Sequence, residues 1–302
     1  MHVFDLHCDS LSEINAERGL INGYNVSKKH GFVQLFAAFV PAANRVPSVR
    51  RAELMRAFNA YLYETERLDV ARIHDARSLN ECLDTGRPGA IFSIEGGGGL
   101  FADSPELMAL YNGGLRCMGL CWDTNELATG AWDENDSGLT PRGRELALVL
   151  EELGVVLDVS HLSDRSFYEL MEITRYPLVA THSNFRSVCP SRRNLTLDMA
   201  RAITARGGVI GLNLCPHFLS GGESATAEDI LRHVDYALEY LGDSSLALGC
   251  DIDGTDGAYP IGFSERESIH DRLIDLLLSR YSDSVVRKIA SENARDFIFG
   301  AI

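Results

Sequence analysis

The sequence predicts an α/β fold in which eight parallel strands and the helices between them form a single (β/α)8 barrel. Apolar, β-rich runs alternate with helix-like segments, and several runs are apolar almost throughout, as parallel strands covered on both faces are. Histidine and carboxylate residues recur where these runs end, and the active sites of such barrels lie at the C-terminal ends of the strands. We expect strands near 2–7, 32–40, 89–95, 114–121, 154–160, 177–182, 207–214 and 246–251.

The segments between the strands are typical of helices, for example at 51–68 and 227–242, and a further helical stretch lies at 282–300. One helix start is well marked, because Thr140 suits the N-cap and the proline after it suits the first helical position. No low-complexity linker, repeat or change of composition divides the chain, so we predict one domain over 1–302. A doubly wound open sheet is the alternative fold, and the order of the strands does not favour it.

Composition and charge exclude several classes of partner. The chain has 28 Lys and Arg against 43 Asp and Glu, a net charge of −15, which disfavours nucleic acid and anionic membrane surfaces. No uncharged apolar run approaches the roughly 20 residues that cross a bilayer, and the first residues lack the pattern of a leader peptide. The seven cysteines lie mostly in apolar runs, which predicts buried reduced thiols. We therefore expect a cytoplasmic protein.

The first predicted strand carries an unusual set of ionisable side chains. The segment "FDLHCDS" places Asp5, His7 and Asp9 at alternate positions, and alternate residues of a strand point to the same face. Three such groups on one face are costly in a core unless a cation neutralises them. The segment therefore suggests a metal ion close to the start of the sequence.

Five of the predicted strands end in side chains that can bind a metal. A single histidine at a strand end is more often structural than a ligand, but that explanation would have to hold independently at every strand. The set combines imidazole with carboxylate and contains no cysteine, which suits zinc or a similar first-row divalent ion. Its members are His7, Asp9, Glu95, His161, His182 and Asp251.

The number of these groups predicts two metal ions. Three histidines and three acids are more than one tetrahedral zinc ion needs. Two ions about 3.5–4 Å apart that share a carboxylate would use the surplus and hold a nucleophilic water. Asp5 is the exception, and we expect it to support the site rather than to bind a metal.

With these residues in place, the sequence resembles the membrane dipeptidase (renal dipeptidase) family of zinc metallopeptidases, within the amidohydrolase-like barrels. The resemblance runs through nearly the whole chain, and it implies hydrolysis of the amide bond of dipeptides, including those with a C-terminal D-residue. It rests on the motifs "DLHCD", "SIEGG", "LDVSH", "THSNFRSVCPSRRN" and "GCDIDG", of which the last two are the most specific.

The resemblance implies a role for each of the metal-binding positions. His7 and Asp9 would bind one zinc ion, and His161 and His182 would bind the other. Glu95 would bridge the two ions and belong to the catalytic residues. The implied cofactors are therefore two Zn²⁺ ions per chain.

The resemblance also implies how the substrate is handled. Asp251 would hold the bridging water as a general base and then pass its proton to the leaving amine. Arg193 would bind the terminal carboxylate of the dipeptide, and the paired donors of a guanidinium suit that partner. Relatives are often homodimers, although the sequence identifies no interface.

Two positions depart from the family pattern. Trp122 stands where animal members carry a histidine that helps to hold the substrate, and an indole N–H can donate a hydrogen bond but carries no charge. Trp122 either shapes the pocket or only packs, and Asp123 or Asn125 would then supply the polar contacts. Phe218 stands in a place where some relatives have tyrosine. Both changes affect the preferred side chains of the substrate rather than hydrolysis itself.

Two other functions remain open. Another binuclear hydrolase, such as an amidohydrolase, lactonase or phosphoesterase, would use the same barrel, but such enzymes usually place a bridging lysine or carbamate on the fourth strand. Here Glu95 follows the third predicted strand. A catalytically silent metal-binding barrel would be expected to lose a ligand or Asp251, and neither is missing. The fold alone does not decide between these classes.

Overall fold

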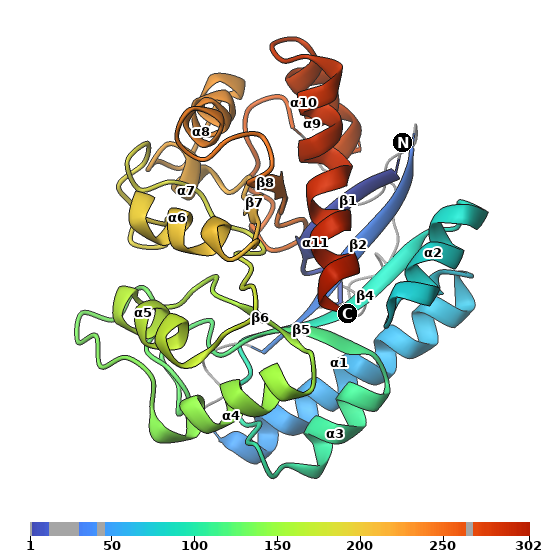
Figure 1. Cartoon of the computed structure of the whole chain (residues 1–302), viewed down its shortest axis with the longest axis vertical. Coiled ribbons are helices and arrows are strands. Elements are labelled where there is room, and N and C mark those ends of the chain that lie inside the picture. The colour runs from blue at the N-terminus through green and yellow to red at the C-terminus, as the bar shows by residue number, and fades with distance from the viewer. Residues whose placement is uncertain (1, 12–29, 41–45, 264–267) are drawn as a thin grey trace.

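The structure is a computed structural model, and it describes residues 2–11, 30–40, 46–263 and 268–302. The fold is α/β, with the strands inside and helices covering them on several sides (Figure 1). The strands are β1 (His2–Cys8), β2 (Gly31–Phe39), β3 (Ala71–Arg72), β4 (Gly89–Glu95), β5 (Leu115–Gly119), β6 (Val156–Asp158), β7 (Ile210–Leu212) and β8 (Leu246–Leu248). The helices are α1 (Pro47–Arg67), α2 (Ala76–Thr85), α3 (Pro105–Asn112), α4 (Pro141–Glu152), α5 (Asp164–Ile173), α6 (Leu197–Ala205), α7 (Pro216–Leu219), α8 (Ala227–Tyr240), α9 (Ile269–Leu278), α10 (Asp283–Arg287) and α11 (Asn293–Ala301), with a π-helical turn at Lys288–Glu292.

The strands form one parallel sheet. Neighbouring strands follow the order β6-β5-β4-β2-β1-β8-β7, and the short β3 pairs with β4. β2 pairs with β4 along the whole length of β4, whereas β1 and β8 are in register through Asp5 and Leu248. Because all the strands point the same way, their C-terminal ends lie at the same edge of the sheet.

The predicted strand at 177–182 is not a regular strand, and here the predicted eight-stranded ladder is found only in part. Val179 makes an isolated parallel bridge to Asp158 in β6, and Ala180 makes another to β7. The next amide, that of Thr181, donates to the carboxylate of Asp158 at 3.0 Å instead of to a neighbouring backbone carbonyl. The segment thus keeps backbone hydrogen bonds to both neighbours at Val179 and Ala180, while the amide of Thr181 bonds to a side chain.

The other seven predicted strands are present, and the differences lie at their ends. β4 coincides with the predicted strand at 89–95. β6, β7 and β8 are shorter than predicted, at three residues each. β3 is not among the predicted strands, because a pairing of two residues leaves no periodic pattern in the sequence.

The helices follow the capping residues that the sequence supplies. Thr140 is the N-cap of α4, and its hydroxyl accepts a hydrogen bond at 3.1 Å from the third amide of the helix. Helix α1 begins earlier than the predicted 51–68 because Pro47 occupies its first turn. Helix α8 falls within the predicted 227–242. The helix predicted at 282–300 is divided into α10, the π-helical turn and α11.

Close packing brings β7, the residue after β8 and Thr181 together near the C-terminal edge of the sheet. A Cβ atom on Gly211 would lie 1.9 Å from the carbonyl oxygen of Thr181, and one on Gly249 would lie 2.0 Å from the same oxygen. Only glycine permits so close an approach of backbones. The ends of β7 and β8 therefore lie directly against the segment that leads into His182.

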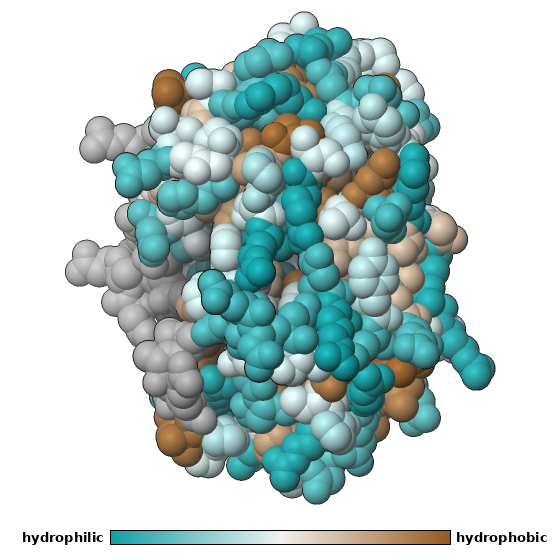
Figure 2. Space-filling model, turned by 90° about the vertical axis from the view of Figure 1, so that its left-hand side faces the viewer, coloured by the Kyte–Doolittle hydropathy of each residue, from teal (hydrophilic) through white to brown (hydrophobic). Residues whose placement is uncertain are grey.

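The cysteines and the described helices can be compared with the predictions of reduced thiols and of no membrane-spanning segment. All seven cysteines are buried and unpaired, as predicted. The face in Figure 2 mixes hydrophilic residues with small, scattered apolar patches. Among the described helices, none has both the length and the apolar character that crossing a membrane requires.

Candidate metal centre

The six side chains predicted to form the metal centre meet at the C-terminal edge of the sheet. His7 is near the end of β1, and Glu95 is the last residue of β4. The other four follow shortly after β1, after β6, after the bridges at Val179 and Ala180, and after β8. All of them are buried, with no residue more than 7% exposed. They are His7, Asp9, Glu95, His161, His182 and Asp251.

One carboxylate oxygen lies at the centre of the three imidazoles. Glu95 Oε1 is 2.7 Å from Nε2 of His161, 3.1 Å from Nε2 of His182 and 3.7 Å from Nε2 of His7. His161 Nε2 and His182 Nε2 are 2.9 Å apart. Potential ligand atoms within 4.8 Å of one another form one group of His7, Asp9 and Glu95 and another of Glu95, His161 and His182, and a further group joins His7 and His182 with Asp251. The first two groups are the ligand sets that the family resemblance implies, and Glu95 is common to both.

Thr181 and Asp158 determine the tautomer of His182. Thr181 Oγ1 lies 2.5 Å from Asp158 Oδ2 and 2.8 Å from His182 Nδ1. A carboxylate can only accept, so the threonine proton goes to Asp158 and the imidazole must donate from Nδ1. The lone pair of His182 is then on Nε2, which faces Glu95 and His161. A histidine held in this way is ready to bind a metal.

Backbone strain helps to aim two of the six side chains. His161 has φ of 71° and Asp251 has φ of 58°, a left-handed conformation that residues other than glycine rarely adopt. The carbonyl of His161 is held by the amide of Ala131 at 2.8 Å. Gly254, in the "GCDIDG" motif, has no room for a side chain, because a Cβ there would lie 2.2 Å from Asp9 Oδ2 and 2.3 Å from Asp251 Oδ1. The motif therefore packs backbone directly against both carboxylates.

The protonation of the centre reflects its burial and its mutual charges. Burial lowers the pKa of His7, but Glu95 and Asp9 outweigh it and raise that pKa to about 10. Burial, reinforced by Asp9, raises the pKa of Glu95 well above its usual value. Burial lowers the pKa values of His161 and His182 well below normal, with Arg193 and His7 adding to the effect. Without a metal ion, these shifts favour a protonated His7 and neutral His161 and His182.

Several donor atoms of the centre lack a partner in the described structure. His7 Nε2, Asp9 Oδ1 and His161 Nδ1 are buried and make no hydrogen bond. Buried polar atoms are normally paired, and such orphans in a group of imidazoles and carboxylates fit ligation of a divalent cation. Binding would displace the protons that the centre otherwise holds. The residues present therefore fit the metal ions that the sequence predicts.

The predicted substrate residues lie beside the centre in two places. Arg193 is buried, and it donates from Nη1 to Ser183 Oγ and from Nη2 to the carbonyl of His182, both at 2.8 Å. Its Nε is buried without a partner among the described residues, and burial lowers its pKa. The guanidinium carbon lies 5.7 Å from the centre of the Phe218 ring. Arg193 and Phe218 thus form one side of the site.

Trp122 lies on another side. Its ring centre is 5.8 Å from that of His161 and 5.2 Å from that of Phe39. Asp123 accepts a hydrogen bond from the next amide at 2.8 Å and, with Trp122, lines a small pocket. Asn125 bonds to the backbone of its own loop through both side-chain atoms, to Leu120 O and from two amides. Asn125 therefore stabilises the loop, and Asp123 and Arg50 line the small pocket beside Trp122.

The sequence prediction missed residues that position the catalytic groups. Asn213, after β7, donates from Nδ2 to Asp251 Oδ2 at 3.0 Å, and its Oδ1 accepts from the amide of Cys215 at 2.6 Å. Asn184 binds the backbone of Asn213 on both sides. A polar residue at the end of an apolar strand is the signal that marks Asn213. Asp158 stands inside a motif that the sequence already singles out.

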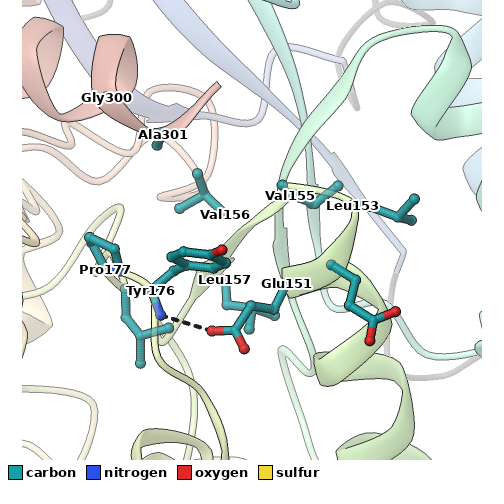
Figure 3. A pocket seen from close by; sticks show the side chains of 12 residues that line it. Glu151, Leu153, Val155, Val156, Leu157, Tyr176, Pro177, Gly300 and Ala301 are labelled. Atoms are coloured by element: carbon teal, nitrogen blue, oxygen red, sulfur yellow. Dashed lines mark hydrogen bonds between the residues drawn. The ribbon is translucent and has the colours of Figure 1, made fainter.

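A separate cavity of about 310 Å³ opens at the other end of β6 (Figure 3). It is lined by Val155 and Val156 at the start of the strand, by Tyr176, and by Ala301 at the end of α11. The amide of Tyr176 donates to Glu151 Oε1 at 2.8 Å. None of the six residues of the metal centre lines this cavity. The metal centre is therefore distinct from it.

Known proteins share both the sequence and the fold. The family model described as "Membrane dipeptidase (Peptidase family M19)" matches residues 1–296. A relative from Klebsiella pneumoniae, named "Uncharacterized protein in pqqA 5'region", is 33% identical over 190 residues, which cover 59% of this chain and 70% of that protein.

Two solved structures align with the whole chain. A structure described as the dipeptidase AC, a metallo peptidase of family M19, superposes with a TM-score of 0.89 at 25% identity and is covered over 98% of its length. A metallo peptidase from Rhodobacter sphaeroides, liganded with a phosphinate mimic of the dipeptide L-Ala-D-Ala, superposes with a TM-score of 0.88 at 24% identity and is covered over 99%. The chain belongs to the membrane dipeptidase family (peptidase family M19) and is a hydrolase of the metallo-dipeptidase class.

Proposed function

We propose that this protein is a binuclear zinc dipeptidase that hydrolyses the amide bond of dipeptides, including those with a C-terminal D-residue. The observation that carries the proposal is the position of Glu95 Oε1 among the Nε2 atoms of His161, His182 and His7, at 2.7, 3.1 and 3.7 Å. A carboxylate between imidazoles on two sides is suited to bridging two cations. The L-Ala-D-Ala mimic bound to the Rhodobacter sphaeroides protein supports the substrate class.

The ligand roles follow from the two groups of donor atoms. His7 and Asp9 hold one ion, His161 and His182 hold the other, and Glu95 joins them. Imidazole and carboxylate donors without a thiolate favour zinc. Two such ions, when bound, would polarise the scissile carbonyl and lower the pKa of the attacking water.

Asp251 is the general base of the proposed reaction. It takes the proton of the attacking water and passes it to the nitrogen of the leaving amine, so that the proton is conserved. Burial raises the pKa of Asp251 to about 6, and the hydrogen bond from Asn213 keeps one of its oxygens in place.

Arg193 binds the C-terminal carboxylate of the dipeptide. Its buried guanidinium keeps an unpartnered Nε within the described structure, and two hydrogen bonds hold the rest of the group. A carboxylate partner would satisfy that donor with matching geometry. Phe218 beside Arg193, and Trp122 with Asp123 beside His161, shape the spaces for the substrate side chains.

Three broader predictions accompany this function. The sheet forms a closed (β/α)8 barrel in one domain over 1–302, supported by the isolated bridges of Val179 and Ala180 to β6 and β7. The close contact of Gly211 and Gly249 with Thr181 supports the same closure. A cytoplasmic location is supported by the seven buried thiols, which suit a reducing compartment.

The test combines metal content with turnover. Elemental analysis of the purified protein is expected to find two zinc ions per chain. L-Ala-L-Ala and L-Ala-D-Ala should be cleaved, the activity should disappear after chelation, and added zinc should restore it. Two ions without cleavage of any dipeptide would favour another binuclear amidohydrolase, lactonase or phosphoesterase, or a silent metal-binding barrel. Failure to bind zinc at all would contradict the proposal.

A further inference from the structure

Asp5 and His270 form a buried pair that the proposed reaction does not use. Both residues are fully buried, and His270 Nε2 lies 2.7 Å from Asp5 Oδ2. Asp5 belongs to β1 and His270 to the first turn of α9, so the pair joins segments 265 positions apart. Gln34 of β2 also donates to the carbonyl of Asp5, at 3.3 Å. Elements β1, β2 and α9 therefore meet at one residue, Asp5.

The other oxygen of Asp5 links the two catalytic strands. Asp5 Oδ1 accepts from the amide of His7 at 3.1 Å and from the amide of Cys250 at 3.0 Å. His7 is a proposed metal ligand, and Cys250 immediately precedes Asp251, the proposed base. One atom thus holds the backbone of both groups.

The backbone pairing between these strands is sparse. β1 and β8 are in register through Asp5 and Leu248, and beyond them Cys8 and Ile252 form an isolated bridge. Between these two contacts no further backbone pair joins β1 to β8 among the described residues, and β1 also shifts its register against β2 between Asp5 and Cys8. The carboxylate of Asp5 occupies this gap and supplies the hydrogen bonds that a regular ladder would have made.

The surroundings of Asp5 favour a charged carboxylate. The carboxylate accepts from Nε2 of His270 and from the amides of His7 and Cys250, so three donors surround it. Such a buried charge is retained only where several donors satisfy it.

A further metal site at Asp5, Cys250 and His270 is the alternative interpretation, and the chemistry of these residues argues against it. Donor atoms of Asp5, Cys250 and His270 lie within 4.8 Å of one another. Burial raises the pKa of the Cys250 thiol well above its usual value, and a thiol binds metal only as the thiolate. Asp5 already accepts from three donors, and a cation at Oδ2 would have to replace the hydrogen bond from His270.

We propose that Asp5 and His270 are positioning residues that hold His7 and Asp251 at the metal centre, so that the ion bound by His7 and Asp9 depends on a histidine of α9. The inference rests on the binuclear site proposed above. Neither residue touches the substrate. His270 donates to Asp5, Asp5 accepts from the backbone amide of His7, and His7 binds the ion in the proposed site.

The test measures the two zinc affinities separately by titration calorimetry of the metal-free protein. His7→Ala and His182→Ala assign each binding step to one ligand set. In His270→Leu, which removes the donor to Asp5, we expect the affinity of the His7 step to fall about 10- to 100-fold while the His182 step changes little. In His270→Gln, which keeps an N–H donor, the affinity should return to within about 3-fold of the wild type. His233→Leu removes another fully buried histidine and is the matched control, which should leave the His7 step unchanged.

Asp5→Asn keeps the test valid if His270→Leu does not fold. The amide oxygen can still accept from His7 and Cys250 but has lost its charge, so we expect a selective loss at the His7 step that is smaller than in His270→Leu. Equal weakening of both steps, or no weakening in any variant, would overturn the inference. A third zinc ion that disappears with His270→Leu would overturn it in favour of a metal site. Fewer than two zinc ions in the wild type would instead reject the binuclear function.

Discussion

His233, in α8, connects two loops on the substrate side of the site, and its protonation provides a quantitative test of the structure. The imidazole is fully buried. Nδ1 accepts from the amide of Phe185 at 3.3 Å, and Nε2 donates to the carbonyl of Leu219 at 3.1 Å. The ring therefore joins the loop after His182 to α7, which carries Phe218. Both contacts need the neutral imidazole, because a proton on Nδ1 would remove the acceptor.

The expected effect is a loss of stability in acid. Burial lowers the pKa of His233 from 6.5 to about 4. Below pH 6.5 the unfolded chain takes up a proton that the folded protein resists until about pH 4, so stability falls across this window and is unaffected above it. Since each pKa unit is worth about 1.4 kcal/mol, acidification from pH 7 to pH 5 removes roughly 2 kcal/mol, and the complete loss is about 3 kcal/mol.

The assay is urea unfolding of the metal-free protein at pH 7 and pH 5, for the wild type and for His233→Gln. Glutamine keeps one donor and one acceptor but does not titrate, so the difference between the two proteins removes the contribution of every other group. The free energy of unfolding of the wild type should fall by roughly 2 kcal/mol more than that of the variant. Replacement of the exposed His74 by glutamine is the control and should leave the pH dependence unchanged. Parallel pH dependence of the wild type and His233→Gln would refute the reasoning.

Three further predictions concern the reaction. Asp251→Asn should retain both metal ions in elemental analysis but lower kcat about 10²- to 10⁴-fold, because the amide cannot accept the proton, and unchanged turnover would rule out its role as the base. His161→Ala or His182→Ala should each lose one metal equivalent per chain, and full retention in both variants would contradict the two-ion assignment. A dipeptide with an amidated C-terminus should be cleaved with a kcat/KM roughly 100-fold lower than the free acid, because Arg193 is then left without its charged partner. Equal rates for the two substrates would show that Arg193 has another role.

The strand prediction succeeded where the local sequence decides the structure. The run at 89–95 coincides with β4 because it is continuous, apolar and β-rich. The run at 177–182 is also apolar in part, yet it makes only isolated bridges at Val179 and Ala180, and the amide of Thr181 bonds to the side chain of Asp158. The helix predicted at 282–300 contains a π-helical turn, and Asn293 after it donates to the carbonyls of Asp243 and Leu246. In both regions the local structure differs from the prediction at residues that contact distant segments of the chain.

The sequence by itself determined the parallel α/β fold and the family, and it singled out the six residues that the structure brings together at the proposed metal centre. It could do so because strand ends and ligand types are local features, and because parallel strands bring their C-terminal ends to a common edge. Only the tertiary structure decided which groups contact them: Asn213 donates to Asp251, and Asp5, which is paired with His270, accepts from the amide of His7. These partners lie 38 and 265 positions apart, and a hydrogen bond over such a separation leaves no periodic pattern along the chain. Their geometry exists only once the core has packed.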